Sequence, residues 1–169
     1  MRTFIIIVGL LAQNFISYSQ SNADLGVAAI GLVVSDIEAS ENFYKNILGM
    51  QNIGEFSLDE PWSTEAGVAK GKPFSVKLFK MKDLPSATVL KLAYFDTTEK
   101  SEDKPTLNFS SGVNYLTLNY TAEEFQKVLE RIEAADIRKL GWVKRDSYQL
   151  FFIKDPDGIF IEIVGPPDN

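Results

Sequence analysis

The residues best suited to chemistry lie near the end of the chain, between Phe151 and Pro166. Two apolar runs flank the turn Asp155-Pro156-Asp157-Gly158, and one carboxylate, Glu162, interrupts the second run. An ionised carboxylate in an apolar strand needs a cation or hydrogen-bond donors beside it. Glu162 is therefore a candidate for a binding or catalytic role. The order Asp, Pro and Gly instead favours a structural type I turn that closes a hairpin.

The composition excludes several kinds of chemistry. The chain contains no histidine and no cysteine, which excludes Ser-His-Asp and Cys-His catalysis and zinc bound through histidine. A domain without cysteine has no disulfide bonds and must be held together by packing alone. The net charge of −6 argues against nucleic acid or anionic lipid as a partner.

The first residues predict a secretory signal peptide. Arg2 precedes an apolar run at residues 4–12, and Ser17 and Ser19 place small residues at positions −3 and −1 of a cleavage site. A membrane anchor is the weaker alternative, because the run is far shorter than the about 20 residues that span a bilayer. We expect residues 1–19 to be removed. Residues 20–169 would then be exported to the periplasm or the exterior, free of the membrane.

The remaining chain repeats one order of elements. Two apolar segments read as strands, and each leads into a capping box that begins a helix, at Ser35 and at Thr121. Further strand-like runs follow each helix, so each half reads strand, helix and about three strands. A polar linker at 97–111 joins the halves, and the first half has an inserted loop at 57–72 that carries Trp62. The strand-like segments are 28–34, 74–81 and 88–95 in the first half, and 114–120, 149–154 and 159–164 in the second.

These motifs resemble the vicinal oxygen chelate superfamily, which includes glyoxalase I, bleomycin-resistance proteins and extradiol dioxygenases. The resemblance rests on Ala29 to Asp36, on Phe43-Tyr44 and Leu48-Gly49, and on the closing Asp-Pro-Asp-Gly hairpin with Glu162. It implies an α+β fold in which two βαβββ modules form a curled mixed sheet around a cleft. The modules would occupy about residues 26–97 and 112–166 of a single domain, 20–169. The resemblance leaves open whether they pair within one chain or across a homodimer.

The resemblance also implies where a metal ion would lie. In metal-dependent members, the first and last strands of each module supply the ligands. The matching positions here are Ala29, Lys91, Tyr115 (or Asn114, if the register shifts by one) and Glu162. A methyl group cannot bind a metal, an ammonium has the wrong charge, and a neutral phenol is a poor ligand. Since divalent ions generally need three or more protein ligands, we expect a degenerate metal site and no cofactor.

Strand alternation predicts which side chains face the cleft. We expect Lys91 and Tyr115 to supply the charge partner and the hydrogen bond of Glu162. The alternative is that Glu162 and Lys91 are separate, hydrated surface residues. The full predicted set of cleft residues is Ala29, Gly31, Val33, Trp62, Phe79, Lys91, Ala93, Tyr115, Thr117, Phe160 and Glu162.

Three classes of function remain open, since a fold alone does not set function. The favoured one is metal-free binding of a small organic molecule in the cleft. The second is a glyoxalase-type lyase or isomerase, either metal-free with Lys91, Tyr115 and Glu162 as acid and base, or with an altered ligand set. The third is a secreted interaction domain.

Overall fold

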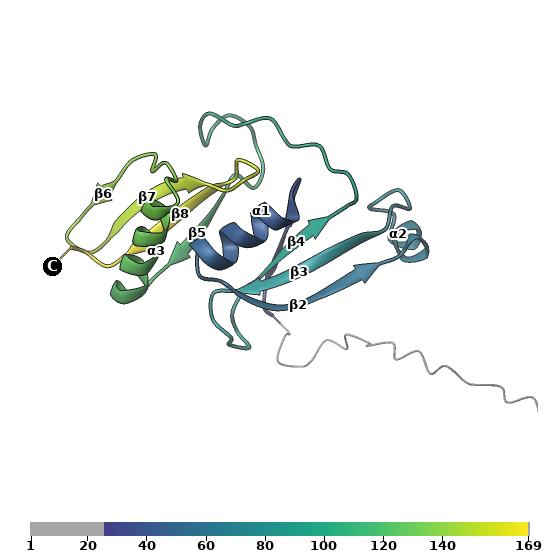
Figure 1. Cartoon of the computed structure of the whole chain (residues 1–169), viewed down its shortest axis with the longest axis horizontal. Helices are drawn as coiled ribbons and strands as arrows, with labels where there is room; N and C mark the ends of the chain where they lie inside the picture. The colour runs from purple at the N-terminus through teal and green to yellow at the C-terminus, as the bar shows by residue number, and fades with distance from the viewer. Residues whose placement is uncertain (1–25, 169) are drawn as a thin grey trace, which may run out of the picture.

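The computed structural model describes residues 26–168 (Figure 1). The predicted signal peptide, residues 1–19, lies outside the described residues, so export stays a prediction. Among the described residues, every helix is too short or too polar to cross a membrane.

The first half forms one four-stranded sheet, named sheet A, with helices, as the sequence pattern predicts. The strand order is β1-β4-β3-β2, with β1 parallel to β4 and the other pairs antiparallel. The π-helical segment η2 continues α1 directly and ends before Gly49, whose φ of 77° is left-handed. The elements are β1 (Ala29–Val33), α1 (Ile37–Glu41), η2 (Asn42–Ile47), β2 (Gln51–Leu58), α2 (Glu60–Ala66), β3 (Phe74–Lys80) and β4 (Val89–Tyr94).

The second half repeats this topology in a sheet of its own. Its order is β5-β8-β7-β6, and its first and last long strands, β5 and β8, are again parallel. The fold is therefore α+β with two βαβββ modules, and the sheets lie side by side as two open four-stranded sheets (Figure 1). The elements are β5 (Tyr115–Asn119), α3 (Ala122–Ala134), β6 (Val143–Lys144), β7 (Gln149–Lys154) and β8 (Phe160–Gly165).

One of the two capping boxes differs from its prediction. At Thr121 the side chain accepts from Glu124 N, and the Glu124 carboxylate accepts from the Thr121 backbone, so the second box is confirmed. The first helix is capped one residue later than predicted, by Asp36, whose carboxylate accepts from the backbones of Glu38 and Ala39. Ser35 does not cap the helix, because its hydroxyl donates to Asp157 in the other module.

The inserted segment 57–72 is not a plain loop, because it contains the helix α2. Asp59 caps this helix by accepting from Trp62 N, and Pro61 lies in its first turn, where a missing N–H costs nothing. Gly67 ends it with a left-handed φ of 71°. The start and stop signals were present in the sequence, but a helix of seven residues is too short to show apolar periodicity.

Both modules share one hydrophobic core. Each sheet turns its aliphatic face toward its helix, and the buried side chains of the two modules form one continuous cluster. Burial of each large side chain contributes about 1.5–3 kcal/mol relative to exposure. Gly165 of β8 allows close packing of α3, since a Cβ there would lie 2.3 Å from the Phe125 ring. The core joins the modules through their helical sides. The opposite sheet faces, called the open faces, carry the exposed side chains of β1 and β5 together with buried ones such as Leu78.

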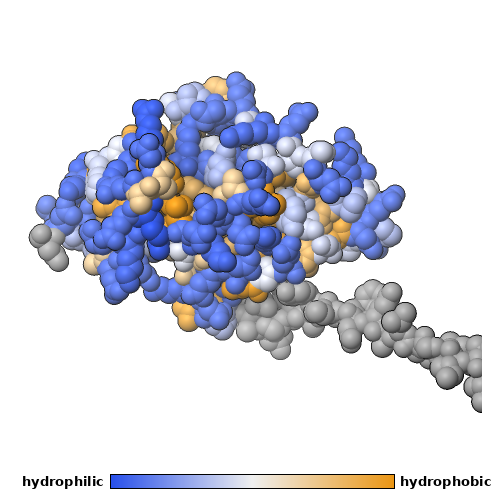
Figure 2. Space-filling view, viewed as in Figure 1, coloured by the Kyte–Doolittle hydropathy of each residue, from blue (hydrophilic) through white to orange (hydrophobic). Residues whose placement is uncertain are grey.

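Hydrophilic side chains cover most of the face shown in Figure 2, and the apolar patches between them are small.

Candidate functional site

The first strand of each module alternates between the core and an open face. In β1, Leu32 is buried, while Ala29, Gly31 and Val33 are exposed, Val33 by 59%. In β5, Leu116 is buried, and Tyr115, at 50%, is exposed. This is the alternation that the sequence predicts, and it turns the small, polar and mixed side chains away from the core.

The register of the closing strands decides which predicted residues meet. In module one, Gly31 pairs with Lys91 and Val33 with Ala93, so the half-buried Lys91 and Ala93 lie on the open face. In module two, Thr117 pairs with Glu162, and Tyr115 pairs with Phe160. Cross-strand partners point to the same face of a sheet. Lys91 of β4 therefore lies on the open face of module one, and Glu162 of β8 lies on that of module two, where Lys154 pairs with Phe160.

The donor to Glu162 is Thr117, not Lys91 or Tyr115. Thr117 Oγ1 donates to Glu162 Oε2 over 2.6 Å. Within residues 26–168, Lys91 makes no ion pair with any carboxylate. The predicted Lys91–Glu162 pair is thus not formed within this chain, because the two residues belong to separate sheets and the parallel register sets Thr117 beside Glu162.

Phe79 is the clear error among the predicted cleft residues. It is fully buried and belongs to the hydrophobic core. It pairs across the sheet with Leu90, which also faces the core, so the strand register directs both side chains away from the open face.

Phe160 lies on the predicted face of β8 but is covered. Lys154 Nζ lies 5.0 Å from the centroid of its ring. The same ammonium donates to Asp103 Oδ1 and to the carbonyl of Lys104, both over 2.6 Å. The linker between the modules is thereby attached near Phe160, whose exposed fraction is 4%.

Trp62 lies in an aromatic cluster at one end of sheet A. Its ring centroid is 6.1 Å from that of Phe74, which in turn stacks on Phe95 at 5.0 Å. Trp62 stays 44% exposed. The insertion therefore places an indole against the first residue of β3, on the same strand face as Val76 and Ala93.

The four residues predicted to match the family's metal-ligand positions do not fit a divalent ion. Ala29 offers a methyl group, Lys91 a positive charge and Tyr115 a phenol, which leaves Glu162 as the single carboxylate. Asn114, the alternative to Tyr115, already accepts from Lys104 Nζ over 2.8 Å. In the described part of the chain, no cluster of three or more His, Cys, Asp or Glu residues could hold a metal ion. No step through a metal ion follows from these residues.

The closing turn has a role that the sequence did not reveal. The turn itself forms as predicted, with Gly158 N donating to the Asp155 carbonyl. Both carboxylates are buried, however, and both bind module one: Tyr44 donates to Asp155 over 2.8 Å, and Ser35 donates to Asp157 over 2.5 Å. The Asp155 carboxylate also accepts from the backbones of Asp157 and Ile159. Burial raises the pKa of Asp155, and the Tyr44 hydrogen bond opposes this rise.

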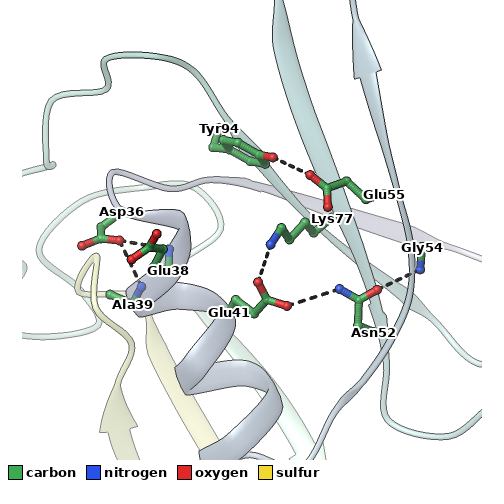
Figure 3. A network of polar contacts seen from close by, with 9 residues as sticks. All are labelled: Asp36, Glu38, Ala39, Glu41, Asn52, Gly54, Glu55, Lys77 and Tyr94. Carbon is green, nitrogen blue, oxygen red and sulfur yellow. Dashed lines mark hydrogen bonds and ion pairs between the residues drawn. The ribbon is translucent and has the colours of Figure 1, made fainter.

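A second polar network lies on the helical side of sheet A (Figure 3). Lys77 of β3 forms an ion pair with Glu41 of α1, and Asn52 donates to the same carboxylate over 3.5 Å. The hydrogen bond from Lys77 lowers the pKa of Glu41. Lys77 pairs across the sheet with Leu92, a core residue. The network therefore holds the helix on the sheet and lies on the opposite side from Lys91.

Residues 26–163 match the family model of the Glyoxalase/Bleomycin resistance protein/Dioxygenase superfamily. The chain belongs to this family. Two lactoylglutathione lyases of Neisseria meningitidis, from serogroups A and B, are 26% identical to it over 136 residues, which is 79% of this chain and 85% of each relative. The resemblance expected from the paired motifs is thus confirmed.

Solved structures of the family share the fold. A glyoxalase family protein from Bacillus cereus is 19% identical with a TM-score of 0.67, and covers 85% of this chain and 95% of its own. A glyoxalase/dioxygenase from Nostoc punctiforme is 29% identical with a TM-score of 0.55, and the coverage is 84% and 91%. The trypanothione-dependent glyoxalase I of Leishmania major is 20% identical with a TM-score of 0.57, covering 82% and 85%. The first and third of these likenesses concern the fold alone.

Proposed function

We propose that this member of the glyoxalase superfamily binds a small organic molecule on the open sheet faces without a metal ion. The observation that carries the proposal is the set of side chains at the four family ligand positions. One small residue, one cation, one phenol and one carboxylate suit hydrogen bonds and ion pairs to an organic ligand. They do not suit chelation of a divalent ion.

The side chains of the open faces indicate which chemical groups such a ligand would have. The Lys91 ammonium has no ion-pair partner among the described residues and is available to an anionic group. Val33 and the ring of Tyr115 offer exposed apolar area to a carbon skeleton. Glu162, fixed by Thr117, offers an acceptor to a donor group. A ligand that spans both faces is either held by the two modules of one chain or enclosed by a homodimer.

Export belongs to the same proposal. The signal-peptide pattern of residues 1–19 supports a mature protein of residues 20–169 in the periplasm or outside the cell. The intact mass of the exported protein tests this. A product that retains residues 1–19 would contradict it.

A glyoxalase-type lyase is the second candidate, because the curated relatives that the chain matches are named lactoylglutathione lyases. In that case Glu162, Tyr115 and Lys91 would be the acid and base groups. A lactoylglutathione lyase assay of residues 20–169, with and without added Zn²⁺ or Ni²⁺, separates the two candidates. The binding proposal predicts no turnover under either condition.

A ligand screen tests the binding proposal directly. Small organic anions and aromatic compounds are tested for a rise in melting temperature, since a ligand specific to the folded state stabilises it. For a hit, Lys91→Ala should weaken binding at least tenfold, as expected for loss of a hydrogen bond to a charged group. Because Lys91 has no partner to lose, its removal should change the free energy of unfolding by less than about 0.5 kcal/mol.

Lys45→Ala is the matched control, since Lys45 is an exposed lysine of η2 on the helical side. It should leave the affinity unchanged. A screen without any hit would favour the third class of function, a secreted interaction domain. Equal affinity of the wild type and Lys91→Ala would place the ligand elsewhere.

A further inference from the structure

A cavity of about 530 Å³ lies between the two modules and extends at one wall to Thr117, the donor to Glu162. It is lined by η2 and the β3–β4 connection of module one, and by β5 and α3 of module two. Ala29, Lys91, Tyr115 and Glu162 are not among its lining residues. Its walls are mainly apolar and include Leu48, Met50, Met81, Leu90 and Leu118. The volume lies within the range of about 300–1,000 Å³ typical of small-molecule sites.

The charged residues that line this cavity are mostly basic. They are Lys82, Lys127, Arg131 and one carboxylate, Glu124, which gives a net charge of +2 in a chain whose net charge is −6. Two of the cations have acidic neighbours. Lys127 donates to Glu123 over 2.5 Å, and Lys82 Nζ lies 3.9 Å from Glu124. The remaining one is Arg131.

Arg131 has a guanidinium without an acceptor. Within residues 26–168 it makes no ion pair, and its Nε is buried without a hydrogen-bond partner. A buried charged donor that lacks an acceptor is costly, so a structure that keeps one calls for an explanation. An acceptor supplied by a ligand in the cavity would satisfy this group.

The surroundings of Arg131 hold the guanidinium beside the cavity. A Cβ on Gly49 would lie 3.0 Å from Arg131 Nη2, so the side chain rests against a backbone with no side chain of its own. The preceding turn is fixed as well, because Tyr120 donates its hydroxyl to the Leu48 carbonyl over 2.8 Å. The hydroxyl of Tyr120 is therefore already used, whereas the Arg131 guanidinium is free to donate.

We propose that this cavity is a second binding site, for a small monocarboxylate with an apolar chain or ring. The carboxylate would pair with the Arg131 guanidinium, whose planar arrangement of N–H groups matches two carboxylate oxygens. The apolar body would lie against Leu48, Met50 and Leu90. One unpaired cation matches a single negative charge, and Glu124 at the lining disfavours a dianion. The site does not depend on the function proposed for the open sheet faces.

Calorimetric titration of residues 20–169 with decanoate tests the proposal. The wild type should bind decanoate and should bind decylammonium at least tenfold more weakly. Arg131→Gln should weaken decanoate binding at least tenfold. Lys127→Gln is the matched control, since Lys127 lies one turn away on α3 and is already paired. It should change the affinity less than threefold.

Two results would overturn the proposal: no decanoate binding by the wild type, or equal affinity in Arg131→Gln. Arg131→Gln should fold, because it breaks no ion pair, and its melting curve checks this. If it does not fold, Arg131→Lys takes its place. That variant keeps the charge without the planar donors and should weaken binding several-fold; an unchanged affinity would again contradict the proposal.

Discussion

At the scale of single residues, two buried carboxylates of the closing turn connect the modules. Asp155 and Asp157 each accept a hydrogen bond from a side chain of module one. Tyr44 lies 111 residues before Asp155 in the chain, yet its hydroxyl donates to that carboxylate. A buried acceptor that loses one of its donors destabilises the folded protein. This explains why a turn that looks purely local in the sequence contributes to the packing of the modules.

Tyr44→Phe should lower the free energy of unfolding by on the order of 1–3 kcal/mol, because it leaves Asp155 Oδ2 buried without a donor. Asp155→Asn should cost less, since its amide oxygen still accepts from the backbones of Asp157 and Ile159. Denaturant unfolding of the three proteins measures this order. Equal loss in both variants would contradict it.

The pH dependence of stability reports on the same carboxyl. Burial raises the pKa of Asp155 in the folded state above its ordinary value of 3.8. The folded protein therefore keeps the Asp155 carboxyl protonated to a higher pH than the unfolded chain does. The contribution of Asp155 to the free energy of unfolding is present below pH 3.8 and is lost as the pH rises through the raised pKa. Asp155→Asn should remove this decline from the curve of unfolding free energy against pH. A curve identical to that of the wild type would show that another group causes it.

At the scale of elements, the ion pair between Lys77 and Glu41 attaches α1 to sheet A (Figure 3). Both side chains are mostly, but not fully, buried. Lys77→Met should therefore lower the free energy of unfolding by about 1 kcal/mol, near the upper limit for exposed pairs.

The hydrogen bond from Lys77 lowers the pKa of Glu41, so the stability that this pair contributes should be lost as the pH falls through that lowered pKa. The variant should lose this acid sensitivity. Glu41→Gln is the partner variant, and a double-mutant cycle that gives no coupling would contradict the account.

The helix α2 is the element in which a ligand on the open faces should produce an optical signal. Trp62 packs on Phe74 and remains partly exposed, so its emission should change when a ligand covers sheet A. The measurement uses Trp142→Phe, which removes the other tryptophan, and Trp62→Phe as the control. Unchanged emission of the Trp142→Phe protein with a bound ligand would rule out a role of α2 as a cover.

At the scale of the whole molecule, the fold could be predicted because it repeats. The sequence shows twice a strand, a capped helix and a set of closing strands. This repeat predicts the two modules and their topology. Alternation along β1 and β5 also gave the open faces correctly. The pairing across strands was not visible, because the sequence does not show register. The sequence therefore predicts Phe79 in the cleft and Lys91 beside Glu162, whereas Phe79 faces the core, and Glu162 lies beside Thr117 in a different sheet from Lys91.

The features that the sequence missed depend on contacts between the modules. The bond of Tyr44 to Asp155, the bond of Ser35 to Asp157 and the cavity beside Arg131 each join residues far apart in the chain. Tyr44 reads as one more apolar position of a helix, and Arg131 as an ordinary surface cation of α3. The contacts of these residues form only when the two modules pack together, so the sequence does not show them.

The metal content of the mature protein tests the central claim most directly. Residues 20–169 are purified without chelator, analysed for bound metal, and then melted with and without added Zn²⁺, Ni²⁺, Mn²⁺ or Fe²⁺. Because the four ligand positions offer one carboxylate, we predict far less than one metal ion per chain and no rise in melting temperature with any of the four ions. One tightly bound divalent ion per chain, whose removal lowers the melting temperature, would contradict the account.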